Sequence, residues 1–69
     1  MELNDYVVDI YTQQLYIITY KNDERVKLQA MGTLDKGIVK LRERRSCSIN
    51  KFNRRYKVSI AIKVLYGKN

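Results

Sequence analysis

One stretch near the C-terminus limits what this 69-residue chain can fold into. Between Arg55 and Tyr66, β-branched or aromatic side chains take every second position, and small or charged residues take most of the positions between them. Strict alternation places the two sets on opposite faces of a β-strand. About twelve residues at roughly 3.3 Å each would span ~40 Å, which exceeds the usual strand. In so short a chain, we expect this strand to bend and to serve two edges of a small barrel.

Three further segments carry the composition or the alternation of strands. They are residues 15–21, residues 25–33 and residues 38–45, and a polar connection over residues 46–53 leads to the last strand. Asn22 begins a polar turn, and Gly37 precedes an apolar run as expected of a hairpin with a left-handed glycine. The sequence therefore predicts a mostly β fold, a small antiparallel five-stranded barrel of the SH3-like or Sm-like kind.

Residues 3–14 fit two patterns. Their apolar positions recur at helical spacing, and Asn4 could cap a helix with Asp5 in its first turn. Tyr6, Val8 and Ile10 also alternate as in a strand. We favour a short N-terminal helix, because Asp5 and Asp9 would then share its solvent-exposed side.

Length and composition narrow the class of protein. At 69 residues the chain forms one small basic β-domain over residues 1–69, and a chain of this size buries only about 60% of its unfolded surface. Cys47 is the single cysteine and histidine is absent, so an internal disulfide and a histidine-based metal site or catalytic base are excluded. No signal-peptide pattern and no apolar run of roughly 18 residues is present, so we expect a cytoplasmic protein without a cofactor and without membrane contact.

The charge is unevenly distributed along the chain. Residues 37–69 carry ten basic residues and one acidic residue, a net charge of +9, whereas residues 1–36 carry four basic and six acidic residues, a net charge of −2. A basic face of this kind suits polyanions, so we predict binding to nucleic acid, either RNA or DNA. The thin core of so short a chain and the largely apolar strand at residues 15–20 favour a homo-oligomer.

The predicted nucleic-acid interface lies around one connection. It comprises Lys40, Arg42, Arg44, Arg45, Lys51, Phe52, Arg54, Arg55 and Lys57. Arginine offers forked donors that match phosphate oxygens, and aromatic rings stack on bases. Phe52 is the candidate stacking residue, whereas Tyr56 keeps the phase of the apolar set and is expected in the core. No catalytic constellation is evident, so we expect a regulatory, non-enzymatic protein.

Residues 3–41 resemble the first motif of the Sm-like family, which includes the Hfq RNA chaperones. The resemblance rests on an apolar strand from Tyr16, a polar turn, the Lys27-Leu-Gln29 strand, the turn with Asp35 and the apolar strand that ends at Leu41. It implies a five-stranded bent sheet, ring-shaped oligomers and RNA binding, with Asp35 as the counterpart of the family's turn aspartate.

Two alternative interpretations stay open. Residues 48–66 also resemble a resolvase-type helix-turn-helix, with Ile49, Phe52, Tyr56 and Val58 at apolar positions of that motif, which would imply a DNA-binding regulator. The other alternative is a small protein-binding inhibitor or adaptor whose basic face meets an acidic protein.

Overall fold

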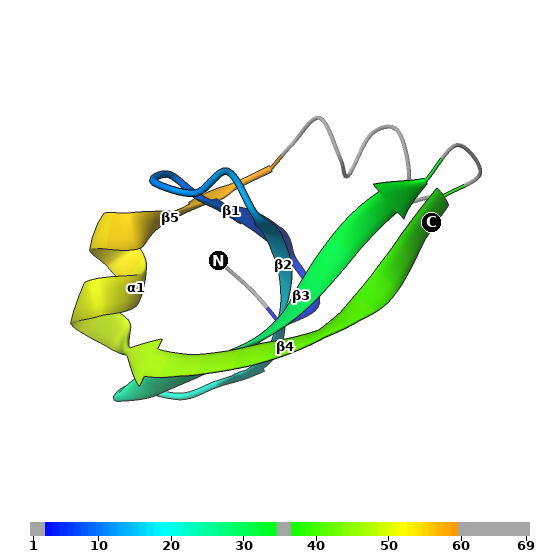
Figure 1. The fold of residues 1–69 in the computed structure, drawn as a ribbon. Helices are drawn as coiled ribbons and strands as arrows, with labels where there is room; N and C mark the ends of the chain where they lie inside the picture. Colours follow the sequence, from blue (N-terminus) through cyan, green and yellow to red (C-terminus); the bar gives the residue numbers. More distant parts are fainter. Residues whose placement is uncertain (1–2, 35–36, 60–69) are drawn as a thin grey trace.

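The computed structural model describes residues 3–34 and 37–59, and Figure 1 shows their arrangement. The described residues form the strands β1 (Tyr6–Asp9), β2 (Leu15–Lys21), β3 (Arg25–Leu34), β4 (Gly37–Ser48) and β5 (Tyr56–Val58), and the helix α1 (Ile49–Arg55). The strands make one antiparallel sheet in the order β4-β3-β2-β1-β5. The expectation of a mostly β fold with five antiparallel strands is therefore confirmed.

The central strands lie where the alternation predicted them. Along β3, Val26 and Leu28 are buried and Lys27 is exposed. The turn before β3 is held by Asn22, whose Oδ1 accepts hydrogen bonds from the N–H groups of Glu24 and Arg25, both at 2.8 Å. These contacts explain why a polar turn at Asn22 separates β2 from β3.

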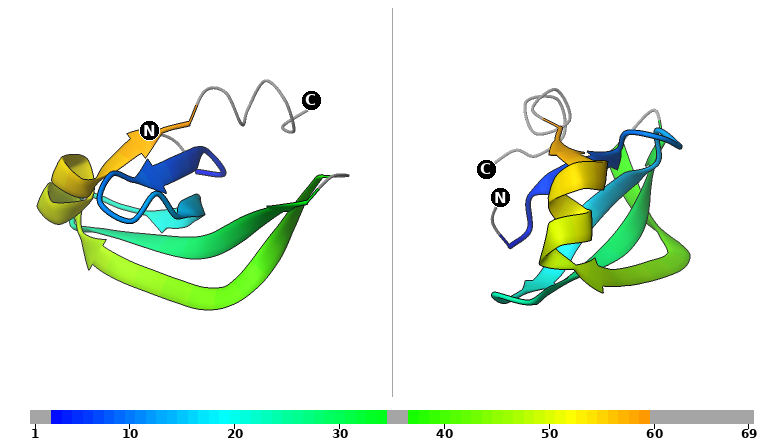
Figure 2. Two further views of the ribbon diagram at one scale, coloured as in Figure 1. Left: turned by 45° about the horizontal axis from the view of Figure 1, so that its top comes forward. Right: turned by 90° about the vertical axis from the view of Figure 1, so that its left-hand side faces the viewer.

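The strand β4 runs further than the sequence suggested. It begins at Gly37, whose φ of +149° is one that side chains rarely adopt, and it continues to Ser48. The polar connection expected over residues 46–53 is therefore wrong, because these residues complete β4 and form most of α1. The register between β3 and β4 shifts between Gln29 and Met31, and Figure 2 shows the bend of β4.

The helix α1 is short but has clear local causes. Ser48 is its N-cap, and the Ser48 Oγ accepts a hydrogen bond from the Lys51 N–H at 3.2 Å. Arg54 and Arg55 lie in the last turn, where cations interact favourably with the helix dipole. At about 1.5 Å per residue the seven-residue helix spans ~10 Å. Since α1 joins the end of β4 to the start of β5, the sheet curls so that these two strand ends lie within that reach (Figure 1).

The favoured N-terminal helix is wrong. Tyr6–Asp9 is the strand β1, which pairs with β2 on one side and with β5 on the other. Val7 and Asp9 face inward and are fully buried. The helical interpretation assumed that Asp9 faces water, whereas two arginines and two backbone N–H groups compensate its burial.

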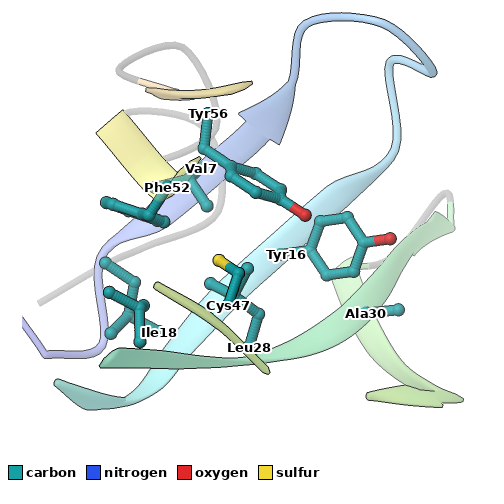
Figure 3. Packing of buried hydrophobic residues seen from close by; sticks show 9 residues of the cluster. Val7, Tyr16, Ile18, Leu28, Ala30, Cys47, Phe52 and Tyr56 are labelled. Carbon is teal, nitrogen blue, oxygen red and sulfur yellow. The ribbon is translucent and has the colours of Figure 1, made fainter. Parts of the chain in front are cut away.

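The core lies inside the curled sheet, with α1 at one end (Figure 3). The buried cluster contains Val7, Tyr16, Ile18, Val26, Leu28, Ala30, Cys47, Phe52 and Tyr56. The Phe52 ring stacks on Tyr56 with a centroid distance of 5.4 Å, and Tyr16 meets Tyr56 edge-on at 5.6 Å. The expected core position of Tyr56 is confirmed.

Only the beginning of the predicted C-terminal strand lies within the described residues. Tyr56–Val58 is β5, and Val58, expected on the same buried face as Tyr56, is 38% exposed. Residues 60–66, the rest of that predicted strand, lie outside the described residues. The same holds for the last part of the helix-turn-helix segment at residues 48–66, which begins with α1 in this structure.

Candidate nucleic-acid interface

Three hollows follow one another over the surface from the sheet to the helix. The sheet hollow, of about 550 Å³, is lined by Thr19, Lys27, Leu28, Gln29, Lys40, Arg44, Arg45 and Ser46. The helix hollow, of about 370 Å³, is lined by Arg45, Ser46, Cys47, Lys51, Arg55 and Tyr56. The turn hollow, of about 270 Å³, is lined by Tyr11, Lys51, Arg54 and Arg55.

These hollows adjoin because neighbouring ones share lining residues. The sheet and helix hollows share Arg45 and Ser46, and the helix and turn hollows share Lys51 and Arg55. We call their seven cations the basic path: Lys27, Lys40, Arg44, Arg45, Lys51, Arg54 and Arg55. Among the described residues, no aspartate or glutamate lines any of the three hollows. Cations therefore follow one another along the path, while Asp9 and Glu43 compensate part of the positive charge at Arg45 and Arg55.

Asp9 lies beneath this path and positions two of its arginines. Its Oδ2 accepts hydrogen bonds from Arg55 Nε at 2.8 Å and from Arg45 Nη1 at 3.1 Å. Its Oδ1 accepts from the N–H groups of Tyr11 at 2.8 Å and Thr12 at 3.3 Å. Burial alone would raise the pKa of Asp9, but the hydrogen bonds from Tyr11, Arg55 and Thr12 and the charge of Arg55 outweigh it and lower the pKa from its usual 3.8 to about 2.

Arg45 is the most constrained cation of the path. Besides Asp9, it donates to the Tyr56 hydroxyl at 3.2 Å and to Glu43 Oε2 at 2.8 Å. Its guanidinium carbon lies 5.1 Å from the centroid of the Tyr16 ring, within the range of a cation–π contact. The hydrogen bonds to Tyr56 and Glu43 raise the pKa of Arg45, and burial raises the pKa of Tyr16 to about 12. Arg45 therefore stabilises the fold through these contacts and also contributes a positive charge.

Gln29 supports the bend of β4 and orients Arg44. This amide is buried, and it is one of the residues that line the sheet hollow. Its Nε2 lies within hydrogen-bonding distance of the carbonyl oxygens of Ala30, Leu41 and Glu43. Its Oε1 accepts a hydrogen bond from Arg44 Nε at 3.2 Å. One side chain thus satisfies carbonyls at the irregular β3–β4 pairing and holds a cation beside the hollow.

Most of the predicted site residues come together on the basic path. Lys40, Arg44, Arg45, Lys51, Arg54 and Arg55 all line a hollow. Arg42 and Lys57 are exposed but do not line any of the three. Phe52 is only 1% exposed, so it cannot offer a face to a base. Its expected stacking role is corrected, because the helical turn places Phe52 on the side of α1 that faces the core.

Sequence reasoning missed two residues of this surface. Lys27 lies on the exposed face of β3, where the β3–β4 pairing places it opposite Ser46, and it lines the same hollow as Lys40 and Arg44. Tyr11 lies between β1 and β2 and is 74% exposed. A tyrosine followed by the polar residues 12–14 is the sequence signal of a turn that could have found Tyr11, but the helical interpretation of residues 3–14 concealed it.

Other kinds of site receive little support in the described part of the chain. Cys47 is a free, buried thiol, and burial raises its pKa. Among the described residues, no three histidine, cysteine, aspartate or glutamate side chains are grouped so that they could hold a metal ion. Within residues 3–34 and 37–59, no helix has the length and apolar character needed to cross a membrane.

Comparisons of the chain with protein-family models, curated proteins and solved structures found no match.

Proposed function

We propose that this protein binds single-stranded nucleic acid, RNA or DNA, along the basic path, as a regulatory protein without enzymatic activity. The observation that carries the proposal is the continuity of the three hollows, whose described lining contains seven cations and no carboxylate. A strand's phosphates repeat along its length, so a series of adjoining basic hollows suits it better than a single pocket would.

Arginine geometry supports the same function. Arg55 uses Nε for its bond to Asp9, and both of its Nη groups lack a hydrogen bond to any described residue. Lys51 and Arg54 form no ion pair within the described residues. Arg55 is held by Asp9 and can bind phosphate oxygens with little loss of side-chain freedom, and Lys51 and Arg54 add donors that no described carboxylate occupies.

The test is a titration of fluorescent single-stranded RNA, single-stranded DNA and duplex DNA of one sequence at several salt concentrations. Binding should weaken as salt rises, because phosphate-bound cations are released. If each cation of the basic path neutralised one phosphate, the log–log slope for a single strand would be about −5, and it would be about −3.5 if Arg45 and Arg55, which carboxylates already pair, did not contribute. No measurable affinity for any of the three at low salt would overturn the proposal and favour the alternative of a basic face that meets an acidic protein.

Two matched double variants locate the site. Lys51→Ala with Arg54→Ala removes two positive charges from the basic path, and Arg42→Ala with Lys57→Ala removes two from outside it. The first should flatten the slope by about 1.4, and the second should change it little. Equal effects would mean that binding follows the overall charge and does not depend on the basic path.

We also infer that the curled sheet is part of a small barrel of the SH3-like or Sm-like kind, as the resemblance of residues 3–41 implies. The short link through α1 between the two edge strands supports this inference. We place the protein in the cytoplasm, where an unpaired thiol such as Cys47 stays reduced.

A homo-oligomer formed through strand edges is a further proposal. Val39 and Leu41 on β4 and Val58 on β5 are 39%, 42% and 38% exposed, and β4 and β5 are the outer strands of the sheet. Exposed edges with apolar side chains favour pairing between copies. Light scattering at tens of micromolar protein should show a dimer or larger assembly, and a monomeric mass would contradict it.

A further inference from the structure

The turn between β1 and β2 is held in one conformation by Asp9. The Asp9 carboxylate accepts hydrogen bonds from the N–H groups of Tyr11 and Thr12, and the Asp9 carbonyl accepts one from the Gln13 N–H at 2.8 Å. Gln13 has a φ of +65°, which reverses the chain direction. The backbone of Tyr11 is therefore fixed by a buried group.

The same carboxylate also fixes Arg55 against this turn. Arg55 Nε donates to Asp9 Oδ2 at 2.8 Å, and the Arg55 carbonyl accepts a hydrogen bond from the Ile10 N–H at 2.9 Å. The guanidinium carbon of Arg55 lies 5.6 Å from the centroid of the Tyr11 ring. Figure 1 shows the β1–β2 turn beside the C-terminal end of α1, from which Arg55 comes.

Tyr11 nevertheless presents most of its surface to solvent. It is 74% exposed, the highest value among the large apolar and aromatic residues that are exposed in the described part of the chain. It lines the turn hollow with Lys51, Arg54 and Arg55. An aromatic ring with one guanidinium against it and two more cations nearby combines what a nucleotide needs, a stacking surface and donors for the adjacent phosphates.

We propose that Tyr11 and Arg55 form a nucleotide subsite at one end of the basic path, in which a base stacks on the Tyr11 ring and its phosphate binds Lys51 and Arg54. This subsite rests on the proposed function and deepens it, because it assigns the base-stacking role to Tyr11. Since Asp9 holds the Arg55 side chain and the Tyr11 backbone before binding, less conformational freedom is lost when the base arrives.

Tyr20 provides a matched control. It is 45% exposed and lies under a cation, with Lys27 Nζ 5.4 Å from its ring centroid. It does not line any of the three hollows, and its hydroxyl accepts a hydrogen bond from Asn22 Nδ2 at 3.0 Å. Tyr20 thus shares the chemistry of Tyr11 without its place on the basic path.

The experiment compares two probes of about 12 nucleotides, within the range that small single-strand-binding domains occupy. One is a mixed-sequence single strand of RNA or of DNA, whichever the wild type binds more tightly. The other is an abasic strand of the same kind with the same number of phosphates. Tyr11→Leu should weaken binding of the first probe roughly five- to 150-fold, with an unchanged salt slope and unchanged affinity for the abasic probe. Tyr11→Phe and Tyr20→Leu should bind both probes as the wild type does.

The outcomes separate the subsite from the proposed function. If the wild type binds and Tyr11→Leu binds the mixed-sequence strand equally well, the subsite is wrong and the basic path stands. If Tyr11→Leu weakens both probes alike, Tyr11 acts on phosphate binding and the stacking role is wrong. If the wild type binds neither probe, the proposed function fails and the subsite fails with it.

A second measurement does not depend on the folding of a variant. Photocrosslinking of the wild type to a strand that contains iodouracil, followed by mass spectrometry, should place the adduct on Tyr11. An adduct on Tyr20 instead of Tyr11 would overturn the subsite.

The stability of the Tyr11→Leu variant is a separate control. Its thermal unfolding should match that of the wild type, because the replaced ring is exposed.

Discussion

Asp9 and Arg55 are 46 residues apart in the sequence and meet at 2.8 Å, Oδ2 to Nε, in the interior of the β1–α1 junction. The Asp9 side chain is fully buried, and the Arg55 side chain is 27% exposed. The contact therefore connects the core to the basic surface. Through it, one carboxylate sets the positions of an arginine and of the turn that carries Tyr11.

Arg45→Ala should destabilise the protein more than Arg54→Ala does. Arg45 donates to Asp9, Glu43 and Tyr56, and its removal leaves part of the charge on a buried carboxylate uncompensated. The expected loss in free energy of unfolding is about 2 kcal/mol for Arg45→Ala, whereas Arg54→Ala, on an exposed helical surface, should cost little. Urea denaturation measures both, and equal stabilities would contradict the structural role of Arg45.

Stability should fall between about pH 4 and pH 2 because of Asp9. Its pKa is lower in the folded protein, about 2, than in the unfolded chain, where it is near 3.8, so folding favours the ionised form. The contribution, on the order of 2 kcal/mol, is fully present above pH ~4 and is lost as the pH falls through ~2.

Asp9→Asn is the control for this pH dependence. The variant is less stable throughout, but its stability should fall less steeply in the acid range, since the titrating group is absent. Urea denaturation at pH 2, 3, 4 and 7 gives both curves. Parallel curves for the wild type and Asp9→Asn would show that other carboxylates cause the acid sensitivity.

Gln29→Glu should weaken the bend of β4. The replacement keeps the shape of the side chain but removes its donor, so the carbonyls of Leu41 and Glu43 lose a partner and face a negative charge. We expect a loss of about 1–3 kcal/mol at pH 7, the usual cost of unsatisfied buried polar groups. Lys27→Ala on the exposed face of β3 is the matched control, and a Gln29→Glu variant as stable as Lys27→Ala would contradict the prediction.

Phe52→Ala should act on stability, since the ring belongs to the core. Truncation of a buried phenylalanine costs about 3–5 kcal/mol, and Phe52→Leu should cost much less because it leaves a smaller cavity. Under conditions in which the variant is still folded, its salt slope for nucleic acid should match that of the wild type. A Phe52→Ala variant with wild-type stability and weakened binding would return the stacking role to Phe52.

The β2 and β3 strands could be predicted because their physics is local. Alternating residues such as Val26, Lys27 and Leu28 lie on opposite faces of any strand, whatever surrounds it. The turn at Asn22 is equally local, since one side-chain oxygen reaches N–H groups two and three residues away. The uneven charge was likewise visible in the sequence, and six of the predicted cations do lie on the basic path.

Only the tertiary structure decided the rest, because the deciding contacts join residues far apart in the chain. Asp9 is buried in a strand because Arg45 and Arg55 reach it from β4 and α1, and no pattern within residues 3–14 contains that information. Phe52 faces the core because α1 places it against Tyr56. Tyr11 gains its cation only when folding brings the β1–β2 turn to the end of α1.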